Sequence, residues 1–140
     1  MSDQMSNRYD RKSLDLTDRE FRQMACGMGV DWTRELHATK GADWRYRLDD
    51  LGRLGAAVFR HSGPDEAAAI VQSFKRGHEL AERFAGRQPL PDDEFVLWST
   101  AALGDWVGEK AAGEQVEDTL RALIRRERRL SDSMGGGLVG

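Results

Sequence analysis

Apolar residues recur at spacings of three and four along most of the chain, a pattern that places them on one face of an α-helix. The first segment begins at Thr17, where Thr-Asp-Arg-Glu matches a capping box, in which the first and fourth side chains satisfy free backbone amides at a helix start. The helical pattern continues to about Lys40. Gly27 and Gly29 lie within it, and each glycine costs a helix about 1 kcal/mol relative to alanine. We therefore expect one helix with a kink or break before Asp31.

Three more helical segments follow. The first spans about 43–60 and the second about 64–85. The third opens near Pro91 with three acidic residues, which suit the positive end of a helix dipole. Its stretch 95–103 is apolar nearly all round, which predicts a central helix that the others cover. Gly113 is expected to separate it from the last helix.

The last helical segment, residues 114–134, combines an apolar stripe with a concentration of arginine. The stripe consists of Val116, Leu120, Leu123, Leu130 and Met134. Arginine occupies five positions on the other faces, namely Arg121, Arg125, Arg126, Arg128 and Arg129. We expect this helix to present a positively charged surface.

Both ends of the chain differ from the helical part. Residues 1–15 are polar and charged, and residues 135–140 contain too little side chain to hold themselves in place. The sequence therefore predicts an all-α fold: a single small domain of about five helices in an irregular bundle over residues 16–134, with a polar N-terminal arm and a flexible glycine-rich C-terminal tail.

Composition excludes several classes of protein. The chain has 140 residues, a net charge of −3 at pH 7 and one cysteine, Cys26, so it fits one domain and can form neither an internal disulfide nor a cysteine-based zinc site. Residues 1–15 lack the apolar stretch of a secretory signal. The apolar run 95–107 is about half the roughly twenty residues that span a bilayer. We expect a soluble protein, without membrane contact, in the cytoplasm or within a virus particle.

No group of residues matches a catalytic or metal-binding pattern. His78 and Glu82 are four residues apart and could share a metal ion, but a zinc site needs three or four ligands. His78 falls on an apolar face, so we interpret it as a core or boundary histidine. His37 and His61 have no recognisable catalytic partner. An enzyme would need a pocket that gathers His78, Glu82 or Asp105, and we expect no enzyme, cofactor or metal site.

Four tryptophans invite comparison with base-stacking surfaces. Trp32, Trp44 and Trp98 fall on apolar helix faces and are expected to fill the core. Trp106 follows a charged residue at the end of its helix, and we expect it at an interface with a partner.

The arginines of the last helix allow two interpretations. In the first, acidic residues three or four positions away pair with them, each pair contributing a few tenths of a kcal/mol. In the second, the four arginines between 125 and 129 outnumber Glu127, leaving about three positive charges that pairing within the helix cannot cancel. Guanidinium groups bind carboxylate and phosphate in a bidentate manner, so the surplus suits an acidic protein surface or a nucleic-acid backbone.

We therefore expect a non-catalytic helical interaction protein that acts as a subunit of a larger protein or nucleoprotein assembly. The make-up is similar to that of small connector subunits of virus particles or accessory subunits of nucleoprotein complexes, an analogy only. The partners expected are other proteins or like subunits. The alternative is a nucleic-acid-binding or regulatory protein that places the same arginines on phosphates. The residues expected to contact a partner are Arg121, Arg125, Arg126, Arg128, Arg129 and Trp106.

Overall fold

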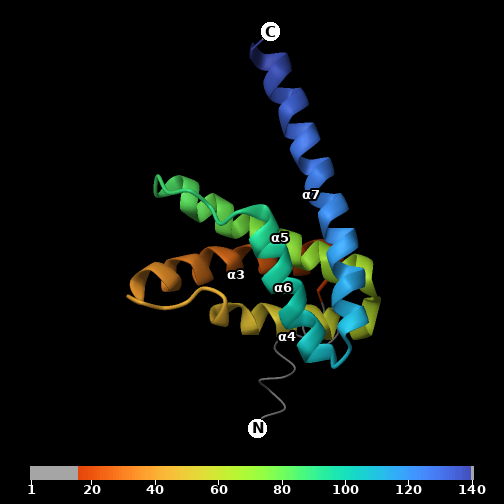
Figure 1. The fold of residues 1–140 in the computed structure, drawn as a ribbon. Coiled ribbons are helices and arrows are strands. Elements are labelled where there is room, and N and C mark those ends of the chain that lie inside the picture. Colours follow the sequence, from red (N-terminus) through yellow and green to blue (C-terminus); the bar gives the residue numbers. More distant parts are fainter. Residues whose placement is uncertain (1–15, 140) are drawn as a thin grey trace.

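The computed structural model describes residues 16–139, with side chains as far as Asp132 (Figure 1). This part of the chain contains five α-helices and one 3-10 turn, and no strand. In chain order the elements are α3 (Asp18–Ala38), η1 (Tyr46–Leu48), α4 (Asp49–Ser62), α5 (Pro64–Phe84), α6 (Asp92–Val107) and α7 (Lys110–Val139). The predicted all-α fold of about five helices is confirmed.

The central helix of the bundle is α5, which packs against α3, α4 and α7. Its residues Ala67, Ile70 and Val71 are fully buried. The prediction that the helix containing residues 95–103 lies at the centre is wrong. That helix, α6, packs mainly against α4 and α7 and leaves Leu97 52% exposed. A helix that is apolar nearly all round therefore keeps one face that no described residue covers.

Two glycines allow α3 and α5 to cross with their backbones in contact. A Cβ atom on Gly29 of α3 would overlap the carbonyl oxygen of Phe74, and one on Gly77 of α5 would overlap the carbonyl oxygen of Cys26. α3 runs without interruption from Asp18 to Ala38, so the predicted break is wrong, and the alternative of a kink stays a prediction. Close packing at Gly29 offsets the cost of glycine within the helix.

A glycine turn separates α6 from α7, but not at the predicted residue. α6 ends at Gly108, whose φ of 87° is the left-handed conformation common at helix ends. Gly113, predicted to separate the two helices, is buried within α7. A Cβ there would lie 2.7 Å from the carbonyl oxygen of Thr100 in α6. Gly113 therefore serves the close packing of α7 on α6.

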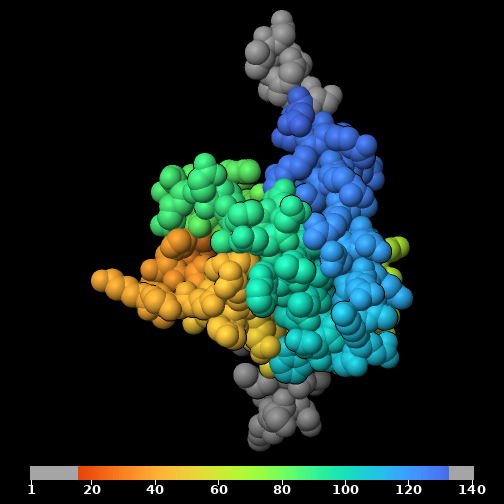
Figure 2. All heavy atoms as spheres, viewed as in Figure 1, coloured from red at the N-terminus to blue at the C-terminus, as the bar shows by residue number. Residues whose placement is uncertain are grey.

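α7 begins inside the bundle and continues beyond it. Val116 and Leu120 are fully buried, whereas Leu130 is 57% exposed. The helix contacts α5 and α6 as far as Arg128, and its end extends past the other helices (Figures 1 and 2). Residues 135–139 of the predicted tail fall within the bounds of α7, and the flexibility of that tail stays a prediction. The predicted arm, residues 1–15, lies outside the described residues.

Candidate interaction surface on α6 and α7

The five arginines of α7 fall into two groups, those with partners inside the chain and those without. Arg121 belongs to the first group. Its Nε donates to Glu117 Oε2 (3.0 Å) and its Nη1 donates to Asp93 Oδ1 on α6 (2.7 Å). The bond to Glu117 is the largest contribution that raises the pKa of Arg121 above its ordinary value. Carboxylates of the same chain therefore match this guanidinium.

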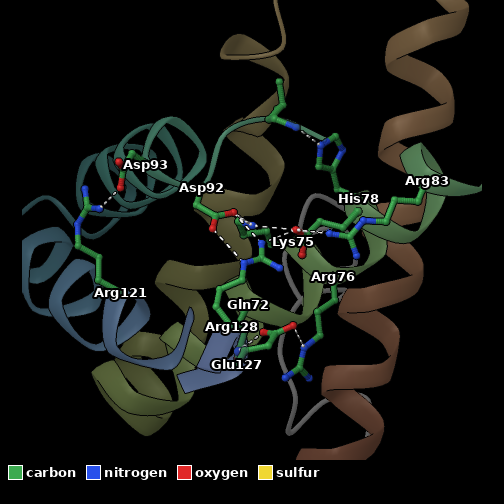
Figure 3. Close-up of polar contacts among 12 residues, drawn as sticks. Gln72, Lys75, Arg76, His78, Arg83, Asp92, Asp93, Arg121, Glu127 and Arg128 are labelled. Atoms are coloured by element: carbon green, nitrogen blue, oxygen red, sulfur yellow. Dashed lines mark hydrogen bonds and ion pairs between the residues drawn. The ribbon is translucent and has the colours of Figure 1, made fainter. Parts of the chain in front are cut away.

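Arg128 also belongs to the first group, in a set of four charged side chains that joins three helices (Figure 3). Its Nη2 donates to Glu79 Oε2 on α5 (2.6 Å) and to Asp92 Oδ1 on α6 (2.8 Å). Lys75 Nζ donates to the same Asp92 oxygen (2.6 Å) and lies 3.3 Å from Glu79 Oε2. Lys75 and Glu79 are both buried. We call Lys75, Glu79, Asp92 and Arg128 the charge cluster.

Within the charge cluster, the pKa values of Asp92 and Arg128 shift in the directions that keep both side chains ionised. Burial alone would raise the pKa of Asp92, but hydrogen bonds from Arg128 and Lys75 outweigh burial and lower that pKa to about 2. The bonds to Asp92 and then Glu79 raise the pKa of Arg128.

The sequence counts Arg128 among four arginines that outnumber Glu127, and its assignment to the unmatched charge is wrong. Arg121, which lies outside that count, also has a partner on α6. The carboxylates of Asp92 and Asp93 reach them from α6, which begins beside α7. Counting charges within one helix cannot detect partners from another helix. Contact of Arg121 and Arg128 with an external partner stays a prediction, but it no longer follows from unmatched charge.

Arg125, Arg126 and Arg129 form the second group. All three are exposed, and none forms a hydrogen bond or ion pair with a residue in the described part of the chain. Glu127, their acidic neighbour in the sequence, pairs instead with Arg76 on α5 (3.3 Å). These three arginines are the unmatched positive charge in the arginine-rich part of α7.

Two of these arginines line a groove of about 440 Å³ between α7 and the start of α6. Arg125 and Arg129 contribute the unpaired positive charge, while the two aspartates of α6 in its wall are already paired inside the chain. Asp132 also lines the groove and pairs with no described residue. Arg126 does not line it, because consecutive residues point about 100° apart around a helix. We call this the basic groove.

A second groove, of about 540 Å³, lies where the end of α6 meets the start of α7. Its charged lining residues are Asp105, Glu109, Lys110, Glu114 and Glu117. Glu117 is the carboxylate paired with Arg121, whereas the other three carboxylates form no ion pair with a described residue. Exposed Leu97 lies in its wall. We call this the acidic groove, and like the basic groove it is lined by residues of α6 and α7.

Trp106, expected at an interface, joins α6 to α4. Its Nε1 donates to Asp49 Oδ1 (2.8 Å), and the guanidinium of Arg53 lies 5.8 Å from the ring centroid. The indole is 39% exposed, so it keeps a free face beside these contacts. Contact of Trp106 with a partner stays a prediction.

The sequence predicts core positions for the other three tryptophans. Trp32 is buried against Phe74, with 5.5 Å between ring centroids, and Trp44 is partly buried against the core. The prediction is wrong for Trp98, which is 40% exposed and has the guanidinium of Arg45 5.0 Å from its ring centroid. Trp98 lies on α6, the helix that was wrongly predicted to lie at the centre of the bundle.

His78 is a buried, hydrogen-bonded core histidine, as the sequence predicts. Its Nδ1 lies 2.9 Å from Thr33 Oγ1, and its Nε2 accepts a hydrogen bond from the backbone N–H of Leu90 (3.0 Å). Burial is the main cause that lowers the pKa of His78. The side chain therefore serves as a neutral link between α3, α5 and the segment before α6.

The carboxylate of Glu82 is engaged by residues that sequence spacing does not bring near it. His37 Nε2 lies 2.9 Å from Glu82 Oε1, and Arg87 Nε donates to the same oxygen (3.0 Å). His37 belongs to α3 and approaches only because α3 packs along α5. Among the described residues, no group of three His, Cys, Asp or Glu side chains is placed to hold a metal ion.

The end of α5 leaves a second apolar patch exposed. The helical pattern places Phe84 on the core side, but its side chain is 95% exposed, and Leu80 is 59% exposed. Both line a pocket of about 400 Å³ beside Val30 and Arg34 of α3. The pattern fails at Phe84 because the described residues leave its side chain uncovered, although α3 lies beside the same turn through His37.

No protein-family model, no curated protein and no solved structure matches this chain. Within the described residues, none of the helices combines the length and the apolar content that crossing a bilayer requires. Function is therefore inferred from the geometry of α6 and α7.

Proposed function

We propose that this chain is a non-catalytic helical subunit that binds a neighbouring protein through α7 and the adjoining face of α6, in the cytoplasm or within a virus particle. The observation that carries the proposal is the exposure of Arg125, Arg126 and Arg129 without a partner among the described residues. They lie in the second half of α7, and Arg125 and Arg129 line the groove between this helix and the start of α6. A partner can approach this part without displacing any other helix.

Physical chemistry favours an acidic protein surface as the partner. A single ion pair between an exposed guanidinium and a carboxylate contributes little binding free energy in water. Several guanidinium groups on one rigid helix can bind several carboxylates without the entropy cost of ordering a flexible segment. Leu130 adds exposed apolar surface next to this charge. A mixed apolar and basic surface with arginine at its centre is typical of protein interfaces.

A photo-reactive phenylalanine analogue at Leu130 tests the proposal in extracts of the source. Irradiation is expected to give an adduct of one discrete mass. The same analogue at exposed Asp31 of α3 should give none. Replacing Arg125, Arg126 and Arg129 together with Ala is expected to reduce the adduct yield about tenfold, because the recognising charge is removed. No adduct at Leu130, or equal adducts at both positions, would contradict the proposal.

The second candidate function is binding of nucleic acid through phosphates. It is favoured by Arg125 and Arg129, which are four residues apart on one helix face and line one groove. Asp132 lies in the same groove and would repel a phosphate. Fluorescence anisotropy with a labelled duplex distinguishes the two functions. Phosphate binding predicts affinity that falls steeply with salt, with a slope reduced by about 2 when both arginines are changed to Ala.

A further inference from the structure

We infer that the partner of this surface is a second copy of the chain, docked antiparallel across the α6 and α7 face so that each basic groove meets the acidic groove of the other copy. The inference rests on the proposed function and names the partner for the same surface. It predicts a closed dimer with a two-fold axis, in which the same patch is used on both copies.

The first argument is the separation of unpaired charge along α7. Glu109 and Glu114, in the acidic groove, form no ion pair with a described residue, and neither do Arg125 and Arg129 in the basic groove. Glu109 lies immediately before α7 and Glu114 near its start, whereas Arg125 and Arg129 lie in its second half. Lys110 and Asp132 carry the opposite sign at the two ends. A second α7 in the opposite direction would place opposite signs against each other at both ends.

The opposite charges are also spaced so that one antiparallel register of two α7 helices can align both pairs. With a rise of 1.5 Å per residue, Glu114 and Arg125 are about 16 Å apart along the axis of α7. Glu109, the residue immediately before α7, lies about 30 Å from Arg129 along the same axis. The midpoints of both pairs fall at or next to Thr119. A single two-fold axis at that level therefore brings both pairs of opposite charges together at once. If the two pairs had different midpoints, a two-fold axis that brought one pair together would leave the other pair out of alignment.

The third argument is the uncovered face of α6. The side chain of Leu97 is 52% exposed and lies in the wall of the acidic groove, with exposed Ala101 beside it. Leu97 lies one helical turn after Asp93, whose carboxylate is bonded to Arg121, so it lies near the level of Thr119. A two-fold axis there would bury Leu97 against Leu97 of the other copy. The second copy would then cover the apolar face of α6, which the pattern of α6 predicts to be buried and which the described residues of a single chain leave exposed.

Matched charge-swap variants test the inference by sedimentation velocity and light scattering. The basic-end variant carries Arg125→Glu and Arg129→Glu, and the acidic-end variant carries Glu109→Lys and Glu114→Lys. Arg34→Glu is the control, because it reverses an exposed charge on α3 that pairs with no described residue and lies outside α6 and α7. Circular dichroism and thermal unfolding check that each variant is folded.

The wild-type chain is expected to be a dimer whose dissociation constant weakens about tenfold when salt is raised from roughly 0.05 M to roughly 0.5 M. Each swap variant alone should dimerise at least about tenfold more weakly, because like charges then meet at both ends. An equimolar mixture of the two swap variants should recover a heterodimer. The control should stay within about threefold of wild type.

Three results would overturn the inference: a wild-type chain that remains monomeric at about 100 μM in low salt, swap variants that do not complement each other, or a control that loses as much affinity as the basic-end variant. These results are distinguishable from failure of the proposed function. A monomeric chain that still forms a discrete adduct at Leu130 with a different protein would remove the second copy as the partner and leave the interaction role in place.

Discussion

His78 has its protonation state set by two neighbours and by burial. The backbone N–H of Leu90 can only donate, so Nε2 must be the acceptor and the proton must reside on Nδ1. Nδ1 then donates to Thr33 Oγ1, whose own proton goes to the carbonyl oxygen of Gly29 (2.8 Å). A second proton on the ring would remove the acceptor for Leu90. The neutral ring is therefore a structural requirement at this position.

His78 should make the stability of the fold sensitive to pH near neutrality. Its folded pKa lies below the unfolded value of 6.5, so below about pH 6.5 the unfolded chain binds more protons and the free energy of unfolding falls. His78→Phe keeps a ring but leaves Leu90 N–H without an acceptor, which should cost about 1–3 kcal/mol at pH 7.5. It should also flatten the stability profile between about pH 7.5 and about pH 5.5.

Urea denaturation across this pH range measures both effects. His61→Gln is the matched control, since His61 is exposed at the end of α4 and should leave the profile of the wild-type chain intact. Equal slopes for wild type and His78→Phe would show that His78 does not contribute the pH dependence.

At the scale of helices, the crossing of α3 and α5 depends on glycine at two positions and not at a third. Gly29 and Gly77 each face the backbone of the other helix, whereas a Cβ on Gly27 would meet nothing within 4 Å. A backbone contact cannot be relieved by rotating a side chain, so a methyl group there must push the helices apart. At a helical position with open space around it, alanine instead stabilises the helix relative to glycine, because its helix propensity is higher.

Two alanine substitutions should therefore have opposite effects on stability. Gly77→Ala is expected to destabilise the fold by at least about 1–3 kcal/mol through separation of α3 from α5. Gly27→Ala is expected to stabilise it by up to about 1 kcal/mol. Thermal unfolding followed by circular dichroism measures both, and a stabilising Gly77→Ala would mean that the two helices do not touch at their backbones.

At the scale of the whole molecule, the charge cluster connects the three helices on which the candidate surface depends. It places Lys75 and Glu79 of α5, Asp92 of α6 and Arg128 of α7 within ion-pair distance of one another. Removing one member of a buried set leaves its partners without compensation. The cluster therefore fixes the start of α6 against α7, and with it the wall of the basic groove.

Arg128 and Arg129 are adjacent arginines with different expected roles. Arg128→Ala should destabilise the fold by about 1–3 kcal/mol, because Glu79 and Asp92 lose a charged donor. Arg129→Ala should stay within about 0.5 kcal/mol, because Arg129 has no partner among the described residues. Guanidinium chloride denaturation measures the free energy of unfolding of both variants. Equal losses for the two variants would show that the charge cluster does not stabilise the fold.

The cluster also predicts loss of stability in acid. The folded pKa of Asp92 is about 2, below its unfolded value of 3.8, so its contribution is complete above about pH 4 and disappears as the pH falls toward 2. Unfolding followed at several pH values in this window should show a smaller acid-dependent loss for Asp92→Asn than for wild type. An unchanged profile would mean that other carboxylates account for the acid sensitivity.

Part of the candidate surface could be predicted from the sequence. The local excess of arginine over acid indicates unmatched charge, and three of the five arginines, Arg125, Arg126 and Arg129, are unmatched among the described residues. The acidic groove was missed. Its signal was present, since Glu109 immediately before α7 and Glu114 near its start precede the arginines, but acidic residues near a helix start are also explained by the helix dipole.

The sequence by itself determined which segments are helical, because apolar spacing and capping act between residues a few positions apart. The capping box at Thr17 and Glu20, for example, forms with both of its hydrogen bonds. Only the tertiary structure decided which of two similar neighbours has a partner, as with Arg128 and Arg129 or Gly29 and Gly27. The partner in each case comes from a helix distant in the chain, and its position depends on how the helices pack.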